Sequence, residues 1–122
     1  MKHAKTVGLL LIIPIGLYAQ IPEDINSGDY LLTCWKSVEK IEGGVTLSAK
    51  ESLQVGYFWG HVLGVSDTLF DEDLVYYPEG ATHHQIILVV GKYLDDHPEL
   101  LHERASRLIR RALIKTFPKR KQ

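Results

Sequence analysis

Cysteine is nearly absent from this chain, in which Cys34 is the only one among 122 residues. A single cysteine excludes an intrachain disulfide, although exported domains of this size often carry them. Cys34 lies on the apolar stripe of a predicted helix, which favours a small buried hydrophobe over a thiol that bridges two chains. It has no evident activating neighbour, so the sequence gives no support for a Cys/His nucleophile.

The usual sequence signatures of catalysis and metal binding are also missing. Neither an HExxH motif nor a glycine-rich phosphate loop occurs. His97 and His102 are five residues apart and cannot share a helix face, whereas His83 and His84 are adjacent and diverge. We therefore expect a binding protein that is not an enzyme and has no cofactor or metal site.

Positive charge is missing from the middle of the chain, where no Lys or Arg occurs between Lys50 and Lys92. Six carboxylates lie in that stretch, and the three at residues 71–73 lack the spacing and the glycine of a calcium loop. From Lys92 onward nine basic residues face four acidic ones. This asymmetry indicates a charged partner, although two solvated faces would account for it as well.

The first 19 residues have the pattern of a secretory signal peptide. Lys2 and Lys5 precede an apolar run over residues 7–17, and Ala19 is a small residue suited to signal-peptidase cleavage. We predict cleavage near Ala19 and a periplasmic mature domain, residues 20–122, that meets the membrane only through the signal peptide during export. An uncleaved membrane anchor is the alternative. A periplasmic address argues against nucleic acid as a partner of the basic C-terminal half.

The mature chain predicts an all-α fold, a small bundle of about four helices. Three helix starts carry capping residues, which are Ser27, the Ser48/Glu51 pair and the Thr82/Gln85 pair. Pro98 suits the first turn of a fourth helix that ends at Pro118. The first helix is expected over residues 28–41, and the third is expected to reach about residue 96.

The second helix is expected to form the centre of the bundle. Nearly every residue from Leu53 to Val65 is apolar, which predicts a helix without a solvent face. A membrane span needs about 20 apolar residues, and this stretch is shorter. Gly56, Gly60 and Gly64 recur every four residues, and each glycine costs roughly 0.5–1 kcal/mol relative to alanine. We expect a neighbouring helix to pack against the backbone there and offset that cost.

Several short fragments stand in a characteristic order along residues 27–118. They are Gly56-Tyr57 with Gly60, Pro78-Glu79-Gly80-Ala81-Thr82 with Gln85, Val89-Val90, Tyr93-Leu94, His97-Pro98-Glu99, Leu101-His102, Ala105, Ala112-Leu113 and Phe117-Pro118. This ordered set resembles the Rap/Tai family of immunity proteins, which protect bacteria from peptidoglycan amidases delivered by type VI secretion. The resemblance implies a periplasmic, all-helical homodimer that plugs the active-site cleft of a cognate amidase.

The chain departs from that family in its cysteines. Three positions at which family members commonly carry cysteine hold Val55, Tyr76 and Lys119, and Cys34 matches the remaining family cysteine. A native disulfide in a small secreted domain typically contributes ~2–5 kcal/mol, so the departure bears on stability. The departure also leaves open whether this chain binds a different partner from other family members. The alternative function is a periplasmic helical adaptor or chaperone-like binding protein without a toxin partner.

The segment Asp67–Ala81 is the longest candidate loop, with room for a short helix from Asp67, and it combines carboxylates with aromatic residues. Long ordered loops in compact domains are often functional. We hypothesise that aromatic anchors in this loop enter the cleft and that its acidic residues steer the approach. The hypothesised contacts are Phe70, Asp71, Asp73 and Tyr77. The alternative is that Tyr76 and Tyr77 pack under the loop.

Overall fold

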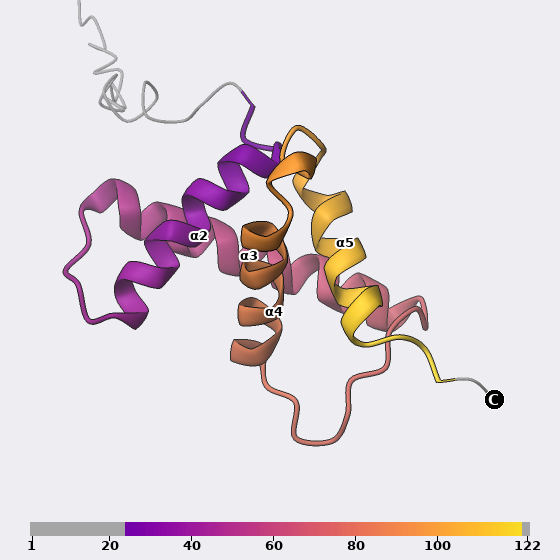
Figure 1. The fold of residues 1–122 in the computed structure, drawn as a ribbon. Helices are drawn as coiled ribbons and strands as arrows, with labels where there is room; N and C mark the ends of the chain where they lie inside the picture. The colour runs from indigo at the N-terminus through magenta and orange to yellow at the C-terminus, as the bar shows by residue number, and fades with distance from the viewer. Residues whose placement is uncertain (1–23, 121–122) are drawn as a thin grey trace, which may run out of the picture.

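The computed structural model describes residues 24–120, which form four α-helices and one short 3-10 helix (Figure 1). The elements are α2 (Gly28–Glu42), α3 (Ala49–Asp71), α4 (His83–Asp96), η1 (Pro98–Leu100) and α5 (Ala105–Thr116). No strand occurs in this part of the chain, which contains only two isolated β-bridges. The predicted all-α class is therefore confirmed. The predicted signal peptide, residues 1–19, lies outside the described residues.

The helix starts lie where the capping residues predicted them. The Ser27 side chain accepts a hydrogen bond from the Tyr30 backbone N–H at the start of α2. At α3 and α4 the side chain before the helix and the side chain three residues later each accept from the other's backbone N–H, giving the Ser48/Glu51 and Thr82/Gln85 capping boxes. Three of the four α-helices thus begin at a signal that is entirely local in sequence.

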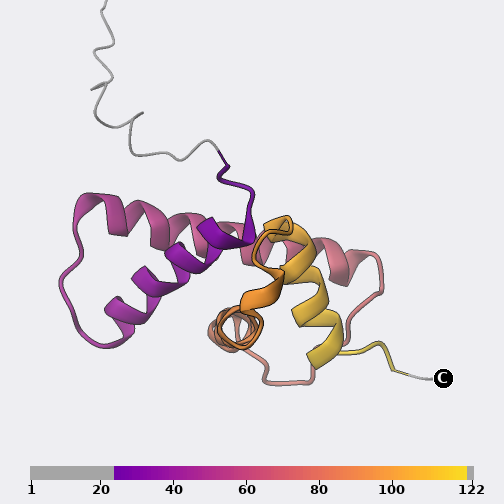
Figure 2. The same ribbon diagram turned by 45° about the horizontal axis from the view of Figure 1, so that its top comes forward.

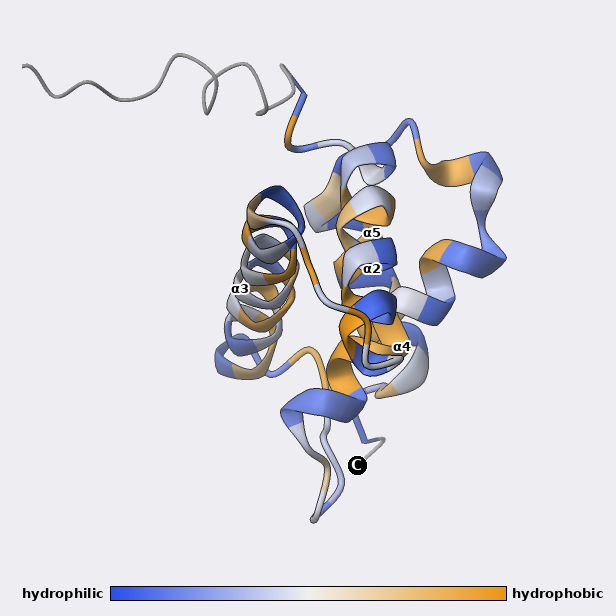
Figure 3. Cartoon of the chain, turned by 90° about the vertical axis from the view of Figure 1, so that its left-hand side faces the viewer, coloured by the Kyte–Doolittle hydropathy of each residue, from blue (hydrophilic) through white to orange (hydrophobic). Residues whose placement is uncertain are grey.

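The helices are arranged with α3 on one side of the other three. Figure 1 shows α3 crossing behind α4, and Figure 2 shows α4 nearly end-on with α3 above it. Every α-helix contacts the other three. Hydrophobic segments of α3 face the remaining helices in Figure 3. The largest fully buried side chains include Phe58 of α3, Leu31 of α2, Ile87 of α4 and Leu108 of α5.

The prediction that the second helix has no solvent face is wrong. The buried residues of α3 form one stripe: Gln54, Phe58, Val62, Ser66 and Leu69. Leu53, which is 59% exposed, lies outside it. A run of aliphatic residues and glycines does not show how many sides of a helix its neighbours cover, and here they cover only one. No helix within residues 24–120 has the length and hydropathy needed to span a membrane.

The predicted role of the three glycines in α3 is wrong as well. A Cβ added at Gly56, Gly60 or Gly64 would meet nothing within 4 Å, because the packed stripe of α3 lies elsewhere on the helix. The close helix contacts of this fold occur at two other glycines. A Cβ at Gly28 would lie 2.7 Å from the carbonyl oxygen of Leu101, and one at Gly91 would lie 2.3 Å from the indole of Trp35.

Replacing Gly60 by alanine is therefore expected to stabilise the protein. The added methyl group enters open space, and alanine favours a helix interior over glycine by roughly 0.5–1 kcal/mol. Chemical denaturation of the wild type and of Gly60→Ala measures the difference in the free energy of unfolding. A clear loss of stability would show that the backbone at Gly60 is covered within the folded chain.

The loop between the second and third helices is shorter than predicted. The prediction began it at Asp67, but α3 continues to Asp71 and leaves residues 72–82 as the connection. The additional turn continues the buried stripe, because Leu69 is 1% exposed. The helix ends here because Asp73, two residues after Asp71, has the left-handed backbone conformation that commonly terminates a helix.

The fourth helix also starts later than predicted. Pro98 opens the 3-10 helix η1, and α5 begins only at Ala105. The backbone between η1 and α5 accepts hydrogen bonds from the start of α2. The amide of Gly28 donates to the Glu103 carbonyl at 2.8 Å, and the amide of Asp29 donates to the Leu101 carbonyl at 2.9 Å. Those carbonyls would otherwise take part in a continuous helix, so docking of α2 favours the break.

Cys34 is buried, as its place on the apolar stripe predicted. It is 0% exposed, and burial raises the pKa of its thiol to about 11. Both features disfavour thiolate chemistry. We expect a reductant to leave the melting temperature unchanged, as measured by thermal denaturation with and without dithiothreitol. A fall in melting temperature would instead reveal a disulfide between two chains.

Candidate partner-binding surface

The predicted contact residues cluster around the C-terminal end of α3. The backbone of Asp73 has a φ of 57°, the left-handed conformation that commonly follows a helix. Its amide donates to the Phe70 carbonyl at 3.0 Å, and the next amide, of Leu74, donates to the Leu69 carbonyl at 2.9 Å. This pair of hydrogen bonds is the Schellman motif. It turns the chain sharply and leaves Phe70, Asp71, Glu72 and Asp73 exposed at the helix end.

Three aromatic rings stand in a row beside this helix end. Phe70 is 61% exposed, and its ring stacks on that of Tyr77 with centroids 6.4 Å apart and planes 11° apart. Tyr77 also contacts Phe117 in an edge-to-face arrangement, with ring centroids 5.0 Å apart. The Tyr77 hydroxyl lies 2.6 Å from the Ser66 hydroxyl, and burial raises the Tyr77 pKa. Tyr77 therefore contacts both other rings and links Phe70 to Phe117.

The C-terminal segment holds the loop in place. The Tyr76 amide donates to the Phe117 carbonyl at 3.0 Å, and Val75 forms an isolated antiparallel bridge with Pro118. Lys119 forms an ion pair with Asp73 at 2.8 Å. These contacts fasten the middle of the loop to the end of the chain, so the loop is fixed at more than its two ends.

Side-chain contacts continue the same junction. The guanidinium of Arg120 lies 4.2 Å from the centre of the Tyr76 ring, in cation–π geometry. Tyr76 and Lys119 are two positions at which the family resemblance places cysteines. The segments that carry them are joined here by hydrogen bonding, an ion pair and this cation–π contact.

A tight turn leads from the loop into α4. Gly80 has a φ of 86°, and the Ala81 amide donates to the Pro78 carbonyl at 3.0 Å. Positive φ at the third residue with this hydrogen bond indicates a type II turn, which favours glycine there. A surface cavity of about 440 Å³ lies alongside, lined by Pro78, Glu79, Gly80, Ala81, Gln85, Leu88, Val89 and Phe117. The Pro-Glu-Gly fragment thus shapes the surface next to the aromatic row.

The two aromatic residues that were predicted as contacts, Phe70 and Tyr77, differ in their exposure. Phe70 is exposed, as a contact residue should be, whereas Tyr77 is half-buried, as in the alternative that places it under the loop. Tyr76, which the same alternative buries, is 39% exposed. Asp71 and Asp73 are exposed beside Phe70. Sequence reasoning missed the support from Phe117, because it lies 40 residues away along the chain from Tyr77 and no local pattern links them.

Tyr57, of the Gly56-Tyr57 fragment, makes contacts that hold the scaffold together. The Tyr57 hydroxyl donates to the Ile25 carbonyl and lies 3.1 Å from Nδ1 of His61. Tyr57 therefore ties α3 to the residues that precede α2.

No cluster of three or more potential metal ligands occurs among residues 24–120. The arrangement at the end of α3 suits contact with another molecule.

Comparison with known protein families gave a match over most of the chain. The model of the family described as Rap1a immunity proteins matches residues 27–118. Comparison with curated proteins gave no match. The matched range runs from the N-cap of α2 to the proline that follows Phe117, so it covers all five helical elements of the described structure.

Proposed function

Because the chain belongs to the Rap1a immunity protein family, we propose that the toxin it neutralises is a peptidoglycan amidase delivered by type VI secretion. Family membership supports an immunity role and a cognate toxin partner. The proposal adds the class of the toxin, a periplasmic site of action and a mechanism. In that mechanism the end of α3 and the loop over residues 72–82 fill the active-site cleft of the amidase and exclude its substrate.

The observation that carries the mechanism is an exposed aromatic ring on a rigid, acidic projection. Phe70 is 61% exposed and rests on Tyr77, which is itself fixed by Phe117 and Ser66. An aromatic anchor held in place before binding loses little conformational entropy on association. A few such anchors usually provide most of the binding energy of an interface.

The carboxylates around Phe70 are expected to increase the rate at which the chain associates with the amidase. Asp71 and Asp73 are exposed, and the side chain of Asp73 is already held by Lys119. We expect Asp71→Asn combined with Asp73→Asn to lower the association rate about tenfold at low salt, with little change in the dissociation rate. Asparagine is the appropriate replacement, because it tolerates the left-handed backbone at position 73.

Surface binding kinetics at several salt concentrations measure this effect. Asp96→Asn combined with Glu99→Gln is a matched control, because both are exposed carboxylates outside the loop and the pair also removes two negative charges. An equal loss of association rate in the control would show that overall charge, rather than the charge at the loop, sets the rate.

Protection of cells tests the proposed function as a whole. A secreted amidase encoded beside the chain is the natural candidate for the toxin. Directed to the periplasm alone, it should lyse the cells, and co-expression of the chain with its own N-terminal segment should prevent lysis. A version starting at Gln20 is the control for export, since it should remain in the cytoplasm and fail to protect. Lysis that is unaffected by the full chain would favour an adaptor without a toxin partner.

A further inference from the structure

A surface cavity with basic walls lies where α4 meets α5, and we call it the basic cleft. Its volume is about 440 Å³. One lining residue comes from α4 and five come from α5, and no acidic residue of the described chain is among them. The lining residues are Tyr93, Arg107, Arg110, Arg111, Ile114 and Lys115.

The spacing of the residues in α5 explains why these cations share one face. Arg107, Arg111 and Lys115 are each four residues apart, so they lie above one another on the same side of the helix. The opposite side packs into the bundle, and its buried residues are Ala105, Leu108, Ile109, Ala112 and Leu113. Because the apolar side is covered, the basic side remains exposed to a ligand.

Three of the four cations in the basic cleft have no ion-pair partner within residues 24–120. None of the ion pairs in this part of the chain includes Arg107, Arg110 or Lys115. The fourth cation, Arg111, pairs with Glu103. The cleft therefore presents positive charge that the described residues do not neutralise.

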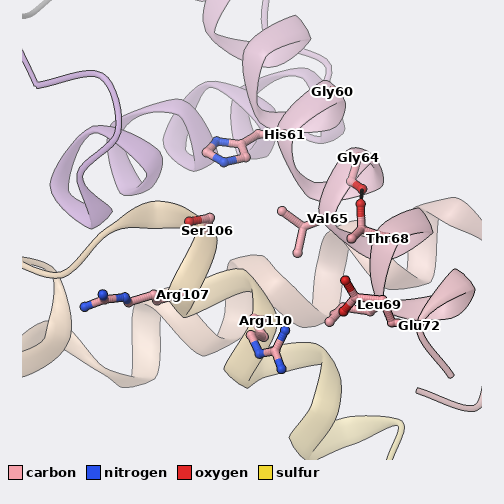
Figure 4. Close-up of a pocket in the computed structure, with 10 residues that line it drawn as sticks. All are labelled: Gly60, His61, Gly64, Val65, Thr68, Leu69, Glu72, Ser106, Arg107 and Arg110. Carbon is pink, nitrogen blue, oxygen red and sulfur yellow. Dashed lines mark hydrogen bonds between the residues drawn. The ribbon is translucent and has the colours of Figure 1, made fainter. Parts of the chain in front are cut away.

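Glu72 of α3 leaves Arg107 free for a ligand. It lines a neighbouring groove of about 430 Å³ between α3 and α5, to which Arg107 and Arg110 also contribute (Figure 4). Figure 4 shows the guanidinium of Arg107 extending away from Glu72. The charge of Arg107 is thus directed away from the acidic end of α3.

The apolar part of the basic cleft is an aromatic ring beside a branched aliphatic chain. Tyr93 and Ile114 are half-buried and pack against the core. The Tyr93 ring also contacts the ring of His97, with centroids 4.3 Å apart. The planar fork of an arginine matches a carboxylate in two parallel hydrogen bonds. The cleft therefore suits a carboxylate that is attached to a small apolar group.

We propose that the basic cleft binds the stem peptides of peptidoglycan. These short peptides carry free carboxylates and the methyl groups of alanine, which complement the arginines and the apolar lining. A concave site admits a projecting chain end, whereas an anionic bilayer presents a broad surface. The choice of this polymer rests on the proposed function, in which peptidoglycan is the substrate of the toxin. Binding to it would raise the concentration of the immunity protein where the toxin acts.

Cosedimentation with purified peptidoglycan sacculi, without any toxin, tests the proposal. The wild-type chain is expected to sediment with the sacculi, and the bound fraction should fall as salt concentration rises. Arg107→Gln combined with Lys115→Gln should raise the apparent dissociation constant at least about tenfold. Lys50→Gln combined with Lys92→Gln is the matched control, because it removes two positive charges from exposed residues outside the cleft. The control should bind as the wild type does.

Competition with a small peptide tests the role of the carboxylate. N-acetylated D-Ala-D-Ala with a free C-terminus should displace the chain from sacculi. The same peptide with an amidated C-terminus should need at least about ten times the concentration, because it lacks the carboxylate that the arginines recognise. Equal displacement by the two peptides would overturn the proposal.

The remaining outcomes separate this proposal from the proposed function. Arg107→Gln combined with Lys115→Gln should still inhibit the amidase in solution, because the end of α3 is unchanged. A chain that sediments with sacculi but does not inhibit the amidase would contradict the proposed function alone. The binding proposal is overturned by a wild-type chain that does not sediment, or by equal losses in the double variant and its control. Stronger binding to phosphatidylglycerol vesicles than to sacculi would also overturn it.

Discussion

Replacing Gly91 by alanine is expected to lower the free energy of unfolding by about 1–3 kcal/mol, the usual cost of overpacking a core. The new Cβ would lie 2.3–2.4 Å from three atoms of the Trp35 indole, inside any permitted contact distance. Trp35 cannot easily withdraw. Its Nε1 donates to Asp95 at 2.9 Å, and its ring centre lies 5.6 Å from that of Phe58. To make room for the methyl group, Trp35 must therefore lose either its hydrogen bond to Asp95 or its packing against Phe58.

The same substitution at Gly60 is the matched control for Gly91→Ala. Both exchanges add one methyl group to a helix interior, so helix propensity favours alanine equally at the two sites. The two changes in unfolding free energy should therefore have opposite signs, with Gly91→Ala destabilising and Gly60→Ala stabilising. Equal effects in chemical denaturation would contradict the packing of α4 against α2 described above.

Replacing Phe70 by alanine is expected to weaken binding to the cognate amidase by at least ~2 kcal/mol, or about thirtyfold in the dissociation constant. The ring is exposed in the free chain, so its removal should cost little folding stability. Isothermal titration calorimetry measures the affinity, and circular dichroism verifies the fold. Leu53→Ala is the control, because Leu53 is a 59% exposed hydrophobic residue near the start of α3, at the end of the helix opposite Phe70.

Tyr77 is expected to act through Phe70 and therefore needs a milder change. Alanine at this position would remove the ring that packs between Phe70 and Phe117 and would disturb the loop itself. Tyr77→Phe keeps both ring contacts and loses only the hydroxyl contact with Ser66. A loss of affinity in Tyr77→Phe without any loss in Phe70→Ala would contradict Phe70 as the principal anchor.

The parts of the fold that the sequence predicted are those encoded locally. Ser27 and the two capping boxes lie within a few residues of the backbone groups they satisfy, so their residue types alone locate three helix starts. Helix class and number follow from such signals.

The failures concern contacts between distant residues. Gly91 and Trp35 are 56 positions apart, and nothing near Gly91 in the sequence shows that an indole fills the space beside it. The regular spacing of Gly56, Gly60 and Gly64 predicted a close packing that belongs elsewhere, because spacing defines a helix face but not its neighbour. The candidate site shows the same division. Its acidic and aromatic composition was evident, but the support of Tyr77 by Phe117 depends on the fold.

Steady-state inhibition of the purified amidase by this chain would show whether the end of α3 and the loop occupy the active-site cleft. Hydrolysis of a soluble peptidoglycan fragment would be followed at increasing concentrations of wild-type chain and of Phe70→Ala. If the projection occupies the active-site cleft, the wild type should raise KM and leave kcat unchanged, because chain and substrate exclude each other. Phe70→Ala should require about thirtyfold more protein for the same inhibition. A wild-type chain that lowers kcat without changing KM, or that does not inhibit hydrolysis, would contradict the account.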